Sequence, residues 1–95
     1  MLTGKQKKFL RAQAHHLKAI FQVGKTGVSE NLATQISLAL TANELVKISI
    51  LQNCETDRYE VAENLVQATG AELVQVLGKT LVLYRATDNR QYTLP

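Results

Sequence analysis

The chain has 95 residues, of which 45% are hydrophobic and 20% are charged, proportions that are ordinary for a single globular domain. It contains no run of 18 or more apolar residues and no signal-peptide pattern, and its single cysteine cannot form an internal disulfide. These features predict a cytoplasmic protein with no membrane partner.

The formal net charge is only +3, but the charge is distributed unevenly. Residues 29–95 carry more acidic than basic side chains, whereas residues 1–28 contain no acid. The six basic residues of that first segment are Lys5, Lys7, Lys8, Arg11, Lys18 and Lys25. A segregated basic surface is typical of proteins that bind nucleic acid.

The first helix is predicted to begin at Thr3 and to end near His16 or Leu17. Thr3 and Gln6 have the spacing of a capping box. At about 100° per residue, Leu10 and Ala14 lie on an arc that we expect to pack. The opposite arc is a cationic stripe of Lys7, Lys8, Arg11, His15 and Lys18. The stripe either solvates the helix or binds an anionic partner.

The remaining elements follow from hydrophobic periodicity and from turn residues. Helices are expected from Ser29, as N-cap, to about Leu40 and from Arg58 to Thr69, where Asp57 supplies a capping signal and Gly70 the C-terminal glycine. Strands are expected over Ala19–Val23, Glu44–Leu51, Glu72–Leu77 and Leu81–Arg85, the last two joined by the hairpin loop Gly78-Lys79. We expect a single domain over residues 1–95, with an ordered core of about 2–86 and a polar C-terminal tail over 87–95.

This order, α-β-α-β-α-β-β, predicts an α/β fold in which three helices back a four-stranded mixed sheet. Strand–helix–strand units give parallel strands, and the final hairpin gives an antiparallel pair. Because the strand over 44–51 alternates apolar residues with Lys47 and Ser49, one sheet face should be less completely covered than the other.

The segment Gly24-Lys25-Thr26-Gly27 lies where the first strand turns into the second helix. Glycines allow close approach of a backbone, Lys25 adds a charge and Thr26 a donor, and a helix N-terminus favours an anion. A phosphate of a nucleic-acid backbone is therefore the expected ligand. The alternative is that the glycines only permit a tight turn.

The sequence contains no nucleotide-binding P-loop. Gly24-Lys25-Thr26 and Gly78-Lys79-Thr80 resemble the end of that motif, but Ala19 and Leu73 occupy the positions where it needs an earlier glycine. We therefore expect no NTPase.

Other reactive side chains have simple structural explanations. His15 and His16 point about 100° apart and have no ligand cluster nearby in the sequence, so no metal site is expected. Cys54 has no activating partner, and the acids Asp57, Glu60 and Glu63 should form a solvated helix face that points away from the nucleic acid. We expect Tyr84 in core or edge packing, with base stacking as the alternative. The sequence thus predicts no enzyme, no cofactor and no small-molecule substrate.

Several segments together resemble the small bacterial YhbY-type proteins, which are stand-alone versions of the CRM domain, named for chloroplast RNA splicing and ribosome maturation. They cover almost the whole chain in order. The segments are Leu2-Thr3-x-Lys5-Gln6, Ala14-His15-x-Leu17-Lys18, Val23-Gly24-Lys25-x-Gly27, Glu44-Leu45-Val46-Lys47, Thr69-Gly70-Ala71 and Val76 to Arg85.

The resemblance implies an RNA-binding module with a fold similar to the C-terminal domain of bacterial translation initiation factor three. It also implies association with the precursor of the large ribosomal subunit, so that ribosomal RNA would be the partner. The family's Gly-x-x-Gly loop, likened to the KH loop that clamps RNA backbone, corresponds to Gly24, Lys25, Thr26 and Gly27. Its basic first helix corresponds to Lys5, Lys7, Lys8, Arg11 and Lys18.

The chain departs from the family pattern after the first helix, and its sheet allows a second function. Ala19 stands where the family usually has proline, so the first helix could continue beyond Leu17 or fray. The chief functional alternative is a protein-interaction module of the translation apparatus that uses an exposed sheet face.

Overall fold

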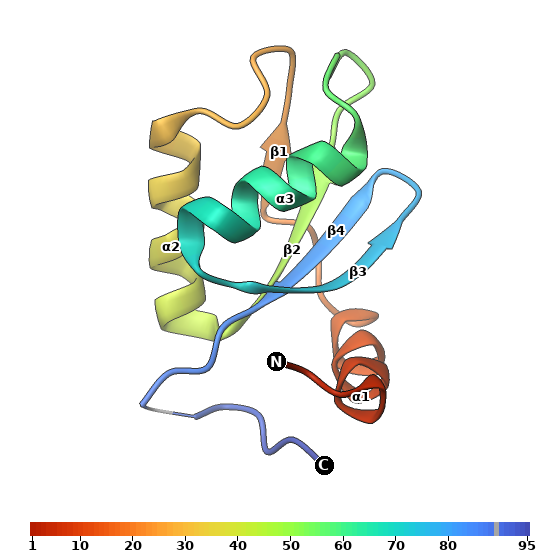
Figure 1. The fold of residues 1–95 in the computed structure, drawn as a ribbon, viewed down its shortest axis with the longest axis vertical. Coiled ribbons are helices and arrows are strands. Elements are labelled where there is room, and N and C mark those ends of the chain that lie inside the picture. The colour runs from red at the N-terminus through yellow and green to blue at the C-terminus, as the bar shows by residue number, and fades with distance from the viewer. Residues whose placement is uncertain (89) are drawn as a thin grey trace.

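The computed structural model describes residues 1–88 and 90–95. It confirms the predicted α/β order of three helices and four strands (Figure 1). The elements are α1 (Gly4–Ala14), β1 (Phe21–Val23), α2 (Glu30–Asn43), β2 (Leu45–Ile50), α3 (Arg58–Thr69), β3 (Glu72–Leu77) and β4 (Thr80–Tyr84).

The four strands form one mixed sheet in the order β1-β2-β4-β3. β1 pairs with β2 in parallel, with Phe21 opposite Ile48, and the other two pairs are antiparallel. The final hairpin therefore places β4 inside the sheet, between β2 and β3, and leaves β1 and β3 at the edges.

The two sheet faces are covered by different elements. α2 and α3 pack on one face, where Ile36, Leu40, Val61 and Leu65 meet the inward side chains of the strands in a fully buried core. α1 packs on the other face, where Leu10 and Ala14 form a smaller core with side chains of β2, β3 and β4. As predicted, the face on the α1 side is less covered, because Lys47 and Ser49 of β2 remain half-buried there.

The expected caps are present. The Thr3 hydroxyl accepts from the Gln6 N–H at 3.1 Å while the Gln6 amide oxygen accepts from the Thr3 N–H at 3.0 Å, which completes the capping box. Ser29 accepts from the Leu32 N–H at 3.1 Å, and Gly70 ends α3 in the left-handed conformation.

Two predicted helix ends are wrong. α1 ends at Ala14 rather than near Leu17, because the Leu17 N–H bonds back only three residues, to the Ala14 carbonyl, and the chain leaves the helix. α2 continues to Asn43 rather than ending at about Leu40. Among the predicted strands, β1 is shorter, over Phe21–Val23, and β4 begins one residue earlier, at Thr80.

Glu44 ends α2 instead of starting a strand. Its φ of 65° and ψ of −41° lie in a region that non-glycine residues rarely adopt. The side chain is fully buried, and its carboxylate accepts from the backbone N–H groups of Thr87 (2.8 Å), Tyr92 (3.2 Å) and Gln91. The segment expected as a polar tail is therefore held against the fold, with Tyr92 and Leu94 packed on the α1 core.

The pKa of Glu44 reflects this environment. Burial raises the pKa of the carboxyl, but the backbone hydrogen bonds from Gln91, Thr87 and Tyr92 lower it by more. The net pKa lies below its ordinary value of 4.5, so the carboxylate is ionised at neutral pH.

Arg85, directly after β4, joins the two helices on the larger core. Its guanidinium donates to the Ser37 carbonyl (2.7 Å) and to the Thr41 hydroxyl (2.7 Å) of α2. It also donates to the Thr69 carbonyl at the end of α3 (2.5 Å). Since both terminal nitrogens of the guanidinium already donate within the fold, these nitrogens are not free to bind an anion.

Candidate nucleic-acid interface

The glycine loop is a tight turn at the carboxyl end of β1. The Gly27 N–H donates to the Gly24 carbonyl at 3.0 Å, and the Leu51 N–H fixes the preceding Val23 carbonyl at 2.8 Å. Lys25 and Thr26, at the tip of the turn, are exposed. The geometry therefore presents a charge and a hydroxyl to solvent on a backbone that is anchored at both ends.

The two glycines of the turn differ in how strictly the structure requires them. Gly27 has a φ of +69°, and a Cβ there would lie 3.2 Å from the Thr56 hydroxyl, so a side chain is strained. At Gly24 a Cβ would make ordinary contacts, 3.6 Å from a Leu51 methyl and 3.8 Å from the Asn53 side-chain oxygen. The turn requires glycine only at position 27; at position 24 other residues would fit.

The N-terminus of α2 contributes less to anion binding than the sequence indicates. α2 begins at Glu30, so Val28 and Ser29 separate it from Gly27, and the Ser29 hydroxyl already accepts one of its free N–H groups. The Glu30 carboxylate in the first turn also opposes a second anion there. An anion at this end would therefore have to be held by the turn itself and by Lys25.

The basic residues of α1 divide into two groups. Of the predicted stripe, Lys8 and Arg11 are exposed and Lys7 is half-buried; Lys5, which the family resemblance added, is also exposed. Lys18 does not belong to that stripe, because α1 ends at Ala14. It lies in the exposed connection to β1 and lines a hollow of about 500 Å³ together with Ile20, Lys47 and Tyr92.

The structure does not bring α1 and the glycine loop together. α1 lies at the end of the molecule that holds both termini, and the loop between β1 and α2 lies at the opposite end of the 37 Å long axis (Figure 1). The predicted site residues therefore occur in two places, and the sheet lies between them.

A groove on the open half of the sheet borders α1. Its volume is about 160 Å³. The side chains that line it come from α1 and from three strands: Arg11, Ala14, His15, Lys47, Gln75, Leu77, Thr80 and Val82. None of these described lining residues is acidic, and the groove joins the basic side of α1 to the uncovered sheet face.

Lys47 is a basic residue of this candidate interface that was not predicted as a site residue from the sequence. It lines both the groove beside α1 and the hollow beside Lys18. Its ammonium lies 3.4 Å from the Leu17 carbonyl, to which it donates. The signal was present in the alternation of the strand, since Lys47 is the basic residue on the polar side of β2.

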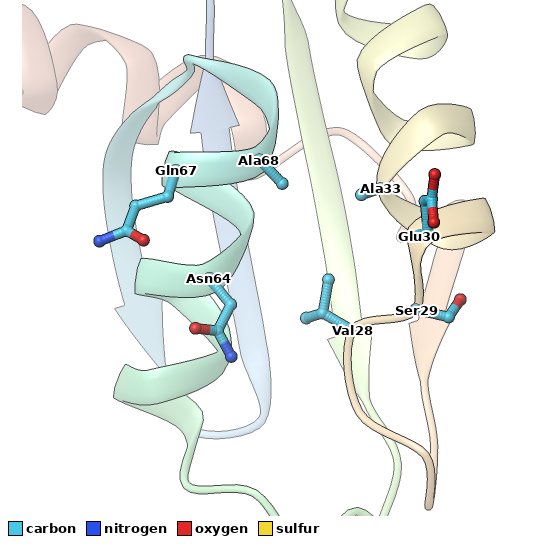
Figure 2. Close-up of a pocket in the computed structure, with 7 residues that line it drawn as sticks. All are labelled: Val28, Ser29, Glu30, Ala33, Asn64, Gln67 and Ala68. Atoms are coloured by element: carbon cyan, nitrogen blue, oxygen red, sulfur yellow. The ribbon is translucent and has the colours of Figure 1, made fainter.

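The pocket between α2 and α3 has a different character. Figure 2 shows Asn64, Gln67 and Ala68 of α3 across from Val28 and Ala33. Its volume is about 380 Å³, and its only charged lining residue within the described chain is Glu30. Glu60 and Glu63 are exposed on α3, and no cation lines this pocket among the residues that the structure describes.

The histidines, the cysteine and Tyr84 each have surroundings that fit a role in the fold. The rings of His15 and His16 meet edge to face at 5.8 Å, and no group of three metal-ligating residues occurs within the described part of the chain. The half-buried Cys54 thiol lies 3.6 Å from the Thr56 carbonyl.

Tyr84 is buried in the α1 core, as expected for packing. Burial, and after it the charge of Glu44, raises the pKa of the Tyr84 hydroxyl. Tyr84 is thus inaccessible to a stacking base.

In the part of the chain that the structure describes, no helix is both long and apolar enough to cross a membrane.

Comparison with known proteins gives consistent matches. The model of the CRS1/YhbY (CRM) domain family matches residues 2–85. "Probable RNA-binding protein YqeI" of Bacillus subtilis is 57% identical, with the whole of both chains covered. A Haemophilus influenzae protein named "RNA-binding protein" is 34% identical over 99% of this chain and 95% of its own. A solution structure of a Staphylococcus aureus protein, described as a candidate for RNA binding, covers both chains fully with a TM-score of 0.85 and 49% identity.

Proposed function

The chain belongs to the CRS1/YhbY (CRM) domain family, and from this premise we propose that it is an RNA-binding protein that acts in assembly of the large ribosomal subunit. Its relatives from Bacillus subtilis and Haemophilus influenzae are named as RNA-binding proteins rather than as enzymes. The ligand is RNA phosphate, held without a cofactor, and the protein acts in the cytoplasm on precursor ribosomal RNA.

The observation that supports the proposal is a set of cations without acidic partners, on α1, in the connection from α1 to β1, and in the glycine loop. Within the described residues, the single ion pair joins the N-terminal ammonium to Glu72 at 3.5 Å, so the α1 cations, Lys18 and Lys25 have no acidic partner. Such cations release condensed counterions when they meet phosphates, which supplies binding free energy without sequence selectivity. The proposed contacts are Lys5, Lys7, Lys8, Arg11 and Lys18 at one end and the turn Gly24-Lys25-Thr26-Gly27 at the other.

Binding should depend steeply on salt. If Lys7, Arg11, Lys18 and Lys25 each contact a phosphate, the log–log slope of affinity against salt concentration should lie between roughly −3 and −4 from these residues alone. Replacing any one of them with glutamine should make the slope shallower by about one unit and weaken binding to different RNA sequences almost equally. Fluorescence titrations at several salt concentrations measure both quantities.

The matched control is the pair Glu60→Gln and Glu63→Gln on α3, on the opposite side of the sheet from α1. Because distant exposed charges are screened at moderate salt, this double variant should bind RNA as the wild type does. The reverse pattern, with the α1 lysines silent and α3 decisive, would contradict the proposed surface and favour a protein-interaction module.

The ribosomal role has a separate test in cells. Ultraviolet crosslinking followed by sequencing of the attached RNA should enrich precursor ribosomal RNA of the large subunit over messenger and transfer RNA. The variant Arg11→Gln, with its weaker phosphate contact, should reduce that enrichment. Enrichment of another RNA class would leave RNA binding in place and refute the ribosomal assignment.

A further inference from the structure

Resting on the proposed RNA binding, we infer that the groove between α1 and the open sheet half receives one unpaired nucleotide, with its base inside the groove. The sites proposed above contact only backbone phosphate. This groove would add a contact to a base, and it would thereby select single-stranded or looped RNA over continuous duplex.

The lining of the groove fits the parts of a nucleotide. Arg11 and Lys47 are among its lining residues and supply cations for the phosphate, and no described acid lines it. Gln75 of β3 and Thr80 of β4 offer donors and acceptors that match the edge of a base. Within the described residues neither of these two side chains makes a hydrogen bond in the fold, so both are free to bind.

The walls of the groove fit the faces of a base. The imidazole of His15 is a planar group on the α1 side of the groove, and histidine side chains stack on unpaired bases. Ala14 and Val82, both buried, form an apolar floor. A base placed there would rest one face on apolar groups, which bind no water strongly. Its edge would keep polar partners.

The size of the groove limits the ligand to one base. Its volume is about 160 Å³, whereas a cavity of about 150 Å³ holds a single benzene ring. A base pair with its two backbones cannot enter such a space. A duplex would touch only the rim, while a nucleotide released from stacking can insert.

The location of the groove also connects the two phosphate-binding regions. Lys47, which lines the groove, lies beside Ile20, since the Ile20 N–H donates to the Lys47 carbonyl at 3.1 Å. From Ile20 to Gly24 the chain is four residues long, or about 13 Å in extended conformation. The polar side chains Gln22, Ser49 and Thr80 form a cross-strand row on this path. A single strand lying on it would pass from α1 over the groove to the glycine loop.

Site-specific photocrosslinking tests the location. A benzophenone amino acid in place of Leu77, at the mouth of the groove, should crosslink to unpaired nucleotides of an RNA hairpin. Leu38 on α2 is the matched control, because the two leucines are 67% and 61% exposed and lie on opposite sides of the sheet. Equal crosslinking from both positions, or crosslinking from position 77 only to paired nucleotides, would overturn the inference.

A double variant tests the contacts. Gln75→Met with Thr80→Val keeps the side-chain sizes and removes the hydrogen-bonding groups. Affinity for single-stranded RNA of mixed sequence should fall about fivefold, with an unchanged salt slope, while affinity for a blunt RNA duplex should not change. Circular dichroism confirms that the variant is folded.

The outcomes separate this inference from the proposed function. If the double variant binds single strands as the wild type does while Lys7→Gln still reduces the salt slope, the groove is wrong and RNA binding stands. If neither variant has an effect and wild-type binding does not depend on salt, both are wrong. If position 77 crosslinks to a protein instead of RNA in cell extract, the sheet face binds a protein, and the inference is refuted.

Discussion

Replacing Glu44 with alanine should lower the melting temperature by about 10 °C or more, the largest effect on stability expected from one exchange in this chain. The carboxylate is fully buried and holds three backbone N–H groups of the C-terminal segment. Hydrogen bonds to a charged group contribute about 1.5–3 kcal/mol each, and the segment would lose its attachment together with the packing of Tyr92 and Leu94. A net loss of about 2–3 kcal/mol corresponds to that shift in a domain of this size.

Two further variants separate the carboxylate from the backbone conformation. Glu44→Gly removes the carboxylate but relieves the positive φ, so it should be less destabilising than Glu44→Ala. Glu44→Gln keeps an acceptor oxygen and loses the charge, so it should lie closer to the wild type. Thermal denaturation followed by circular dichroism measures all three. An alanine variant as stable as the wild type would show that the C-terminal segment is not attached through Glu44.

The Glu44 effect should depend on pH in a defined direction. Since the folded-state pKa is lowered below 4.5, the unfolded state binds the proton more tightly. The stabilisation is therefore complete above about pH 4.5 and is lost as the pH falls through the folded-state value. The difference in stability between the wild type and Glu44→Gln should shrink in that acidic range and remain constant near neutrality.

Placing an aspartate in the glycine loop should weaken RNA binding by at least about tenfold, which is roughly 1.4 kcal/mol. Gly27→Asp adds bulk and negative charge beside the proposed phosphate. The structure adds a second consequence: the φ of +69° makes a side chain at this position strained, so this variant should also lose stability. Titration of structured RNA, with the melting temperature measured in parallel, separates the two effects.

The neighbouring glycine supplies the cleaner experiment. At Gly24 a Cβ makes only ordinary contacts, so Gly24→Asp should fold normally and still bind RNA poorly. Gly24→Ala is its uncharged control, and Gly27→Asn serves the same purpose at position 27, because asparagine tolerates the left-handed conformation. Undiminished binding by both aspartate variants would remove the loop from the interface.

Most of the fold was predictable because its signals are local. Helix N-caps, a C-terminal glycine and apolar periodicity each involve residues that are close in sequence, and they located α3 and β3 to the residue. The errors concern interactions between distant segments. The end of α2 is set by Glu44, whose partners lie 43 to 48 residues further along the chain. Nothing in the local pattern distinguishes that glutamate from the first residue of a strand.

The candidate site was predictable in composition but not in arrangement. The basic residues and the glycine turn were found from charge and spacing. Their separation along the long axis of the molecule follows from the packing of α1 against the far end of the sheet, which one sequence does not show. Lys18 was assigned to the helical stripe because the helix was expected to continue beyond Ala14. Lys47 was seen only as the polar side of a strand, since its neighbours Arg11 and Lys18 come from distant segments.

The edges of the sheet bear on how the protein behaves at high concentration. An exposed edge strand offers a row of unpaired N–H and C=O groups on which another molecule can add a strand. Here one edge, β1, has only three residues, and the other, β3, has an irregular register between Leu73 and Gln75. Neither offers a long, regular template for intermolecular pairing. A polar sheet face can therefore stay uncovered on this domain without promoting aggregation through its edges.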